Sequence, residues 1–193
     1  AAVSVPVMVN GMRTGPGYWK GTRILLGGAT AGEFEGCFRD ATSGITHFPS
    51  LDSWKATVKA LIDIQNRGRR AMCWTKTWTT ASNAQIQQWH DFALASFLLG
   101  AWGKKQYFFF SGSRRDTALT WYGDGRYRLG RPVSPIKHIG SIWKRRYSNG
   151  VVVVNPTGTA DSISFTNTFL FPSGRRAKST NLAAHTGQIL MEP

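Results

Sequence analysis

Residues 71–110, AMCWTKTWTTASNAQIQQWHDFALASFLLGAWGKKQYFFF, contain the pattern that decides the fold class of this chain. Apolar and aromatic residues fill 71–78 and again 107–110, and both runs have the length and character of buried strands. Between them, Ser82 and Gln85 have the spacing of a helix capping box. Apolar side chains then recur at helical intervals, at Ile86, Trp89, Ala93 and Phe97. The segment therefore predicts a strand, a helix over 82–100 and a second strand.

The preceding part of the chain continues this alternation of strands and helices. Residues 3–9 and 33–38 have the composition of short strands, whereas 11–23 predicts a loop and 23–26 a short helix or strand. A helix is predicted from Ser50, a good N-cap, to the glycine at 68. Its apolar stripe is formed by Trp54, Val58, Leu61 and Ile62. Parallel neighbours need long crossovers, so the order predicts a parallel α/β sheet or barrel.

The pattern changes after residue 111. Residues 112–141 are rich in Gly, Arg and Pro and predict a long connection. From 142 onwards the signals are those of strands, with an Asn149–Gly150 hairpin turn. The strands are predicted at 142–147, 151–154, 162–165, 168–171 and 188–191. We therefore expect three regions, an α/β region over 1–111, the connection over 112–141, and a small antiparallel β-sandwich-like domain over 142–193.

Three segments in order carry a resemblance to a known family. They are LGRPV at 129–133, IWKRRYSNGVVVVNPT at 142–157 and TGQIL at 186–190. Together they resemble the closing part of hypothetical glycoside-hydrolase-like proteins with a TIM-barrel fold. The resemblance implies the second half of a (β/α)8 barrel, with its last four strands at 5–10, 33–38, 71–78 and 106–111. A complete barrel needs roughly 250 residues, so another segment or another chain is expected to complete it.

Two carboxylates are the candidate catalytic residues. Glu35 is the first choice and Glu33 the second, because a strand through 33–38 would place both on one face. Glycosidases use two carboxylates, one as general acid and one as nucleophile or base. The resemblance places the partner acid on an earlier strand, outside this chain. A purely structural ion pair with a nearby Arg or Lys is the alternative for both residues.

Candidate substrate-binding residues follow the predicted strands, where barrel enzymes place their binding loops. Aromatic rings there can stack on sugars, while amide, hydroxyl and cationic groups bond to sugar hydroxyls. The candidates are Asn10, Arg13, Trp19, Trp74, Lys76, Trp78, Ser111 and Arg114. Each also has a plainer interpretation, as a core tryptophan or a solvated loop residue. The expected partner is a polysaccharide or glycan, and the expected activity, where present, is O-glycosyl hydrolysis.

Net charge supports a second hypothesis from a different class. The chain has 24 Lys and Arg against 10 Asp and Glu, a formal charge of +14. Such a field attracts polyanions. The alternative is therefore a non-catalytic basic subunit of a larger assembly, a barrel remnant that binds RNA or another polyanion.

The remaining signals bear on cofactors and cellular context. The four histidines and two cysteines show no metal-ligand spacing, so we expect neither a metal nor another cofactor. For Cys37 and Cys73, two buried thiols are favoured over one disulfide. No transmembrane segment or signal peptide is predicted. The start on a strand-like segment suggests a processed or partial polypeptide; the sequence does not assign a location, and secretion and an organelle are both compatible with processing.

Overall fold

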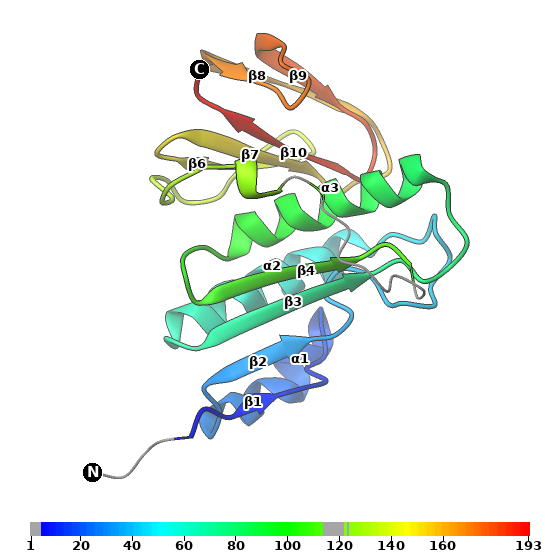
Figure 1. Cartoon of the computed structure of the whole chain (residues 1–193), viewed down its shortest axis with the longest axis vertical. Helices are drawn as coiled ribbons and strands as arrows, with labels where there is room; N and C mark the ends of the chain where they lie inside the picture. The colour runs from blue at the N-terminus through cyan, green and yellow to red at the C-terminus, as the bar shows by residue number, and fades with distance from the viewer. Residues whose placement is uncertain (1–4, 114–121, 123) are drawn as a thin grey trace. The chain divides into compact units, whose positions relative to one another are not determined.

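The computed structural model describes residues 5–113, 122 and 124–193 (Figure 1). The chain forms two compact units, Ala1–Thr80 with Gly100–Arg114, and Ala81–Leu99 with Arg115–Pro193. The first contains a parallel sheet and the second a curled antiparallel sheet. The predicted α/β class is thereby confirmed.

The parallel sheet has the strand order β1-β2-β3-β4, the same as the order in the sequence. Every neighbouring pair is parallel. The strands are β1 (Met8–Val9), β2 (Ala31–Phe34), β3 (Arg70–Lys76) and β4 (Gln106–Ser111).

Two of these strands are shorter than the sequence predicts. Of the described part of the 3–9 run, residues 5–9, only Met8 and Val9 form β1, which pairs only with β2 among the described strands and follows a proline that has no amide hydrogen to donate. β2 ends at Phe34, because the chain turns at residues 35–36. The regular strand geometry that was expected to join Glu33 and Glu35 on one face therefore does not extend to Glu35.

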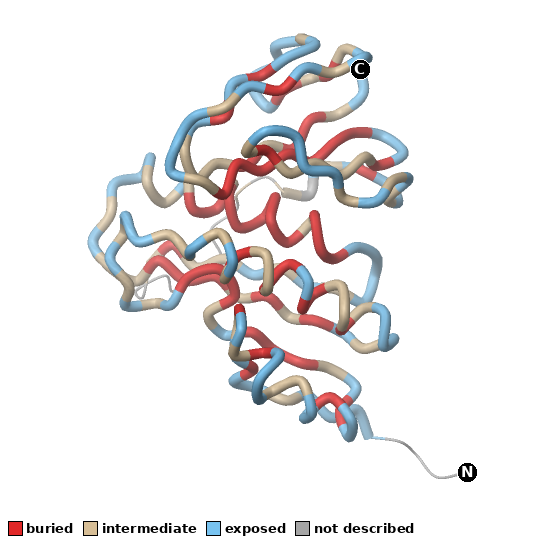
Figure 2. The backbone as a smooth tube through the Cα atoms, turned by 180° about the vertical axis from the view of Figure 1, so that it is seen from behind, coloured by how far each residue is buried: buried red, intermediate tan, exposed pale blue. Residues whose placement is uncertain are grey.

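Helix α2 (Leu51–Asn66) has the predicted ends. The Ser50 hydroxyl accepts a hydrogen bond from the Ser53 amide at 3.3 Å, and Gly68 has the positive φ of 68° that often ends a helix. The buried stripe contains Trp54, Val58 and Leu61 as predicted, but it ends with Ile64 in place of Ile62. Figure 2 colours the buried positions along the backbone red, and such positions occur in both units.

A short helix, α1 (Pro16–Lys20), occupies the segment that was predicted as a loop, and a 3-10 helix, η1 (Thr22–Gly27), follows it. Proline at the first helical position favours α1, because its fixed φ suits a helix. Gly15, with φ of 56°, precedes α1 and approaches α2 closely. A Cβ atom at Gly15 would lie 2.5 Å from the Ser53 hydroxyl, so only glycine fits there.

Asp63 joins α1 and η1 to α2. Its carboxylate accepts hydrogen bonds from the Tyr18 hydroxyl at 2.6 Å and from Arg23 at 2.9 and 3.0 Å. Arg67, one turn along α2, donates a further bond at 2.9 Å. The hydrogen bonds from Arg23, with those from Tyr18 and Arg67, hold the pKa of Asp63 well below its usual value of 3.8.

Acid is therefore expected to destabilise the first unit through Asp63. Its folded pKa lies below the unfolded value, so its contribution is complete at neutral pH and is lost as the pH falls below about 5. We expect the free energy of unfolding to fall by about 2 kcal/mol more in the wild type than in Asp63→Asn between pH 6 and pH 2.5. Urea titrations at both pH values measure this difference. Asp52→Asn, at an exposed carboxylate of the same helix, is the control and should behave as wild type; equal acid sensitivity of all three proteins would contradict the prediction.

The second unit contains a six-stranded antiparallel sheet of order β5-β6-β7-β10-β8-β9. All six described strands belong to this one curled sheet, in place of the expected two-sheet, sandwich-like arrangement. β6 also contacts β8, which is not its neighbour in the sheet, because the curl brings them together. The strands are β5 (Lys137–Ile139), β6 (Ile142–Tyr147), β7 (Gly150–Asn155), β8 (Asp161–Leu170), β9 (Arg176–Leu182) and β10 (Thr186–Met191).

Sequence patterns located most of these strands, including the hairpin of β6 and β7. β8 is one strand with an irregularity between Ser164 and Phe169, and this irregularity made it look like two. β5 and β9 were not predicted. β5 is exposed throughout, and β9 is mostly polar with only Thr180 and Leu182 buried, so both lack the apolar pattern that marks a half-buried strand. A 3-10 helix, η2 (Asp124–Arg126), precedes them.

Helix α3 (Asn83–Gly100) begins at the predicted capping box, where Ser82 and Gln85 exchange hydrogen bonds. Near its end, the Leu99 carbonyl accepts a bond from Arg145 at 2.7 Å, and the Leu98 carbonyl accepts one from the Tyr147 hydroxyl. These β6 side chains satisfy carbonyls that have no partner inside the helix. Helix α3 thus packs on one face of the curled sheet.

The inner face of the curl holds the core of the second unit. Every residue of β7 is buried, which explains its run of four valines, since this strand is covered on both faces. The inner core consists of Ile142, Val151, Val153, Ile163, Phe169, Phe171, Leu182 and Leu190.

Candidate functional site

Polar and aromatic side chains gather where β2, β3 and β4 end. The Lys76 ammonium at the end of β3 lies 2.6 Å from a carboxylate oxygen of Glu35, the first residue after β2. The Lys76 side chain is only 4% exposed, whereas that of Glu35 is 49% exposed. The ion pair therefore has a buried cation and an accessible carboxylate.

Two tryptophans enclose Lys76. Its ammonium lies 3.6 Å from the ring centroid of Trp74 and 4.8 Å from that of Trp78. Both rings offer the electron-rich face that attracts a cation. The two rings meet edge to face at 6.0 Å. Lys76 thus occupies one face of Trp74 and is fixed in position by aromatic rings and by Glu35 together.

Ser111, the last residue of β4, completes this arrangement. Its hydroxyl accepts a hydrogen bond from the indole nitrogen of Trp78 at 2.9 Å and donates one to the Ser113 carbonyl at 3.1 Å. The Ser111 carbonyl accepts the amide of Thr77 at 2.8 Å. We call Glu35, Trp74, Lys76, Trp78 and Ser111 the strand-end cluster. These five were all candidates in the sequence, and the structure brings them together.

Glu33 lies in β2, on the same face of the sheet as the strand-end cluster. Residues paired in a parallel sheet point to the same face, and Glu33 pairs with Met72, which pairs with Tyr107. Glu33 is 7% exposed, and its carboxylate has no hydrogen-bond or ion-pair partner among the described residues. A carboxylate in such a setting is a candidate for function, because burial without a partner is costly.

The sheet face that carries Glu33 also carries exposed aromatic rings. Tyr107 and Phe109 of β4 are 46% and 44% exposed, and Phe109 packs edge to face on Trp74 at 5.6 Å. Cys73 points to the opposite face, toward α2, where it is buried. We call the face with Glu33, Met72, Trp74, Tyr107 and Phe109 the open face. Parallel sheets are normally covered on both faces, so exposed rings here are unusual.

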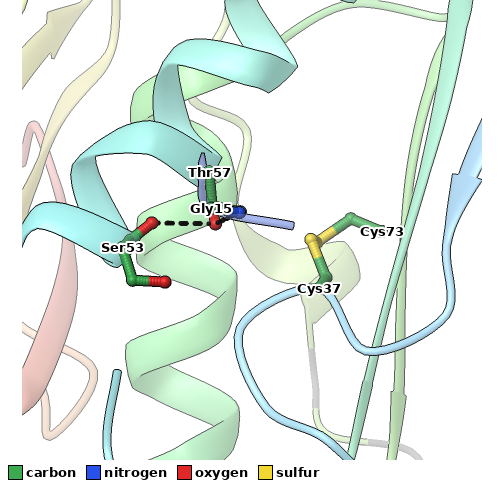
Figure 3. The surroundings of a disulfide bond; sticks show 5 residues. All are labelled: Gly15, Cys37, Ser53, Thr57 and Cys73. Carbon is green, nitrogen blue, oxygen red and sulfur yellow. Dashed lines mark hydrogen bonds between the residues drawn. A yellow bond between two sulfur atoms is a disulfide. The ribbon is translucent and has the colours of Figure 1, made fainter. Parts of the chain in front are cut away.

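A disulfide bond connects Cys37 with Cys73 (Figure 3). The prediction of two thiols was wrong, because Cys37 lies in the loop after β2 and the sequence did not show that this loop folds back onto β3. The Cys37 amide also donates a hydrogen bond to the Trp74 carbonyl at 2.9 Å. The disulfide and this bond hold the segment that begins with Glu35 against β3.

Arg39 is a positioning residue that the sequence did not reveal. It is 3% exposed, and its guanidinium donates to the Lys76 carbonyl at 3.1 Å and to the Thr79 hydroxyl at 2.8 Å. Other bonds go to carbonyls of its own loop, at Asp40 and Ser43. Burial lowers the pKa of Arg39. The side chain thereby joins the loops after β2 and β3, and its place in a Gly- and Ser-rich loop gave no signal of this.

Among the described residues, Asn10, Arg13 and Trp19 make no hydrogen bond or ion pair with the strand-end cluster. Asn10 and Arg13 are exposed in the loop after β1. The Trp19 side chain contacts α2, because its indole nitrogen donates a hydrogen bond to the Ala56 carbonyl at 3.2 Å. Arg23 lies over the Trp19 ring at 5.4 Å. Arg114 lies outside the described residues.

Within the described ranges, no group of three or more His, Cys, Asp or Glu side chains is arranged to hold a metal ion. In the same part of the chain, no helix is both long enough and apolar enough to cross a membrane.

Ligands of parallel α/β sheets typically bind at the carboxyl ends of the strands, and the strand-end cluster has this arrangement. Comparison with protein families gives a specific relationship. The model of hypothetical glycosyl hydrolase family 15 matches residues 18–151, well over half of the chain. The chain therefore belongs to this family, which confirms the resemblance to glycoside-hydrolase-like proteins. No curated protein matches the chain.

Proposed function

We propose that this chain is the half of a glycosidase-like (β/α)8 barrel that contributes β1 to β4, and that its strand-end cluster binds a polysaccharide. The observation that carries the proposal is the grouping of an accessible carboxylate, a buried ammonium and aromatic rings at the carboxyl ends of neighbouring parallel strands. Barrel enzymes place their active sites at this end of the strands.

Strand order supports the half-barrel. Parallel strands that neighbour one another in sequence order are the arrangement of a (β/α)8 barrel, in which right-handed crossovers place the helices on the outer face. The opposite face then closes into the interior of a barrel. The open face has the aromatic and apolar side chains that such an interior requires, and Tyr107 and Phe109 would be covered by the remaining strands.

In this proposal the residues divide into sugar-binding and catalytic groups. Phe109 and Trp78 offer ring surface for a sugar, because Lys76 already covers one side of Trp74. Glu35, paired with an ammonium, is suited to act as the nucleophile or the base. Glu33, or a carboxyl group of the remaining barrel, would protonate the glycosidic oxygen. Asn10, Arg13 and Arg114 remain proposed contacts for more distant sugar units, whereas Trp19 is proposed to have a structural role.

The intact mass of the natural polypeptide tests the half-barrel. We expect either a mass well above 21.3 kDa or a stable complex with a second chain that carries the other strands. A natural protein of 21.3 kDa that remains monomeric and has Tyr107 and Phe109 accessible to solvent would contradict the half-barrel.

Binding of polysaccharides tests the site. Trp78→Ala in the natural protein is expected to weaken binding of its polysaccharide about 10- to 100-fold, because stacking and burial of a large ring contribute about 1.5–3 kcal/mol. Calorimetry or affinity electrophoresis against a polysaccharide panel measures the change. Trp102→Ala is the control, because it removes another accessible indole ring, 42% exposed, that precedes the start of β4 and so lies at the opposite end of that strand. Equal losses of affinity in Trp78→Ala and Trp102→Ala would contradict the assignment of the strand-end cluster as the polysaccharide-binding site.

The alternative, a non-catalytic basic subunit that binds RNA or another polyanion, is favoured by the net charge of +14. It predicts binding that weakens steeply with salt. Stacking of a neutral sugar on Trp78 should depend little on salt, so the same titrations at two salt concentrations separate the two proposals.

A further inference from the structure

The curled sheet of the second unit contains a basic cavity away from the strand-end cluster. Its volume is about 330 Å³, and three cations line it, Lys137 of β5 with Lys144 and Arg146 of β6. None of its lining residues is acidic, and within the described part of the chain the only carboxylate in an ion pair with these cations is that of Glu192, which accepts a bond from Arg146. The cavity therefore holds an excess of positive charge.

Cross-strand pairing brings the two lysines together. Lys137 and Lys144 lie directly opposite each other in the antiparallel pair of β5 and β6. Like charges at such positions destabilise a sheet. Burial, together with the charge of Lys137, lowers the pKa of Lys144. An anion bound between the two ammonium groups would relieve this repulsion and thereby stabilise the pair of strands.

Arg146 lies two residues beyond Lys144 and hence on the same face of β6. Its guanidinium lies 5.0 Å from the ring centroid of Phe169. One of its terminal nitrogens, Nη1, is buried and has no hydrogen-bond partner among the described residues. The Arg146 backbone amide donates to the Ser134 hydroxyl at 3.1 Å, which places that hydroxyl at the cavity as well.

The rest of the lining fits a sugar ring. Phe165 and Phe169 provide aromatic surface, and Ser164 and Asn167 of β8 provide hydroxyl and amide groups. Aromatic surface beside a few polar groups is typical of small-ligand pockets, and the volume is at the small end of their range. A pocket of this volume accommodates one ring, whereas an extended polyanion would need a continuous basic groove.

We propose that this cavity binds one acidic sugar residue of a polysaccharide, with its oxyanion between Lys137 and Lys144 and its ring beside Phe165 and Phe169. The oxyanion is the carboxylate of a uronic acid or a sulfate ester. The proposal rests on the carbohydrate-directed function above and adds to it that the polysaccharide is anionic. The second unit would then supply the recognition of an acidic sugar residue.

The test is calorimetric titration of the natural protein with three oligosaccharides of equal length, one of hexuronates, one sulfated and one neutral. At least one of the acidic probes is expected to bind. Lys144→Gln should weaken its binding at least 10-fold, Lys137→Gln combined with Lys144→Gln should abolish it, and Lys144→Arg should retain most of it. Lys178→Gln, at an exposed lysine of β9 outside the cavity, should have no effect. Thermal unfolding of each variant shows that the fold is retained.

Three outcomes would overturn the proposal. These are an equal loss in Lys178→Gln and Lys144→Gln, unchanged binding of every acidic probe in the double variant, and displacement of the acidic sugar by a single-stranded RNA that binds with the same dependence on Lys144. The Trp78→Ala titration tests the proposed function separately. Acidic-sugar binding that depends on Lys144 but not on Trp78 would leave the cavity assigned and the strand-end cluster in question, whereas the reverse pattern would overturn the cavity alone.

Discussion

Glu35→Gln is expected to lower kcat/KM for hydrolysis of the polysaccharide by about 10²- to 10⁴-fold in the natural protein with its complete barrel. Glutamine keeps the shape of the side chain and one oxygen that can accept a hydrogen bond from the Lys76 ammonium, but it removes the negative charge. A nucleophile or base without this charge cannot stabilise an oxocarbenium-like transition state. Rates of release of reducing ends from the polysaccharide measure the effect.

Two further variants make the result specific. Asp52→Asn removes an exposed carboxylate at the start of α2 and should leave the rate unchanged. Glu33→Gln removes the buried carboxylate of β2 and is expected to lower the rate by a similar factor if Glu33 is the general acid. Full activity of Glu35→Gln would refute its catalytic role and leave the ion pair with Lys76 as a purely structural feature.

Stability must be measured alongside activity, because Lys76 is almost completely buried. A buried ammonium that loses its carboxylate partner is destabilising, so part of any loss of activity could reflect unfolding. The midpoint of thermal unfolding separates the two causes. A folded Glu35→Gln protein with little activity supports catalysis, whereas a protein that regains activity on cooling indicates a loss of stability only.

Removal of the disulfide is expected to have the largest effect on stability. Cys37 and Cys73 are 36 residues apart, and closing a loop of this size restricts the unfolded chain enough to contribute about 4 kcal/mol. The double variant with Cys37→Ala and Cys73→Ala should therefore have a free energy of unfolding about 4 kcal/mol below that of the wild type. Its unfolding transition should accordingly lie at a lower urea concentration. Tryptophan fluorescence can follow the transition, because Trp54 and Trp74 lie in the same unit.

A reducing agent provides the internal control. Dithiothreitol should lower the stability of the wild type toward that of the double variant and leave the variant itself unchanged. Hydrogen exchange should also become faster at residues 35–38, since the bond holds this segment against β3. Equal stability of wild type and variant, both before and after reduction, would contradict this account.

The disulfide lies close in the sequence to two residues of the strand-end cluster, Glu35 and Trp74. Cys37 comes two residues after Glu35, and its amide bonds to the Trp74 carbonyl. The covalent link and the Arg39 hydrogen bonds thus fix two loops whose side chains meet at the strand-end cluster. Sites held in this way lose less entropy when a ligand binds, because the side chains are already ordered.

Local patterns in the sequence determined most of the regular elements. The apolar stripe and the caps at Ser50 and Ser82 specify α2 and α3, because helix ends depend on bonds between residues three or four apart. The valine run and the turn at Asn149 specify the hairpin of β6 and β7 in the same way. The motifs at 129–133 and 142–157 identified the glycoside-hydrolase-like family, although the match to the family model ends at residue 151.

Tertiary structure alone decided which side chains meet. The pairing of Glu35 with Lys76 joins residues 41 apart, and the disulfide joins residues 36 apart. The interaction of Lys137 with Lys144 depends on β5, a strand whose exposed residues have no apolar periodicity. A sequence pattern reports burial and local hydrogen bonds over a few residues, whereas the register between strands and the path of a loop depend on packing over the whole unit. The sequence therefore determined most of the elements and the family, and the packing of distant segments determined the site.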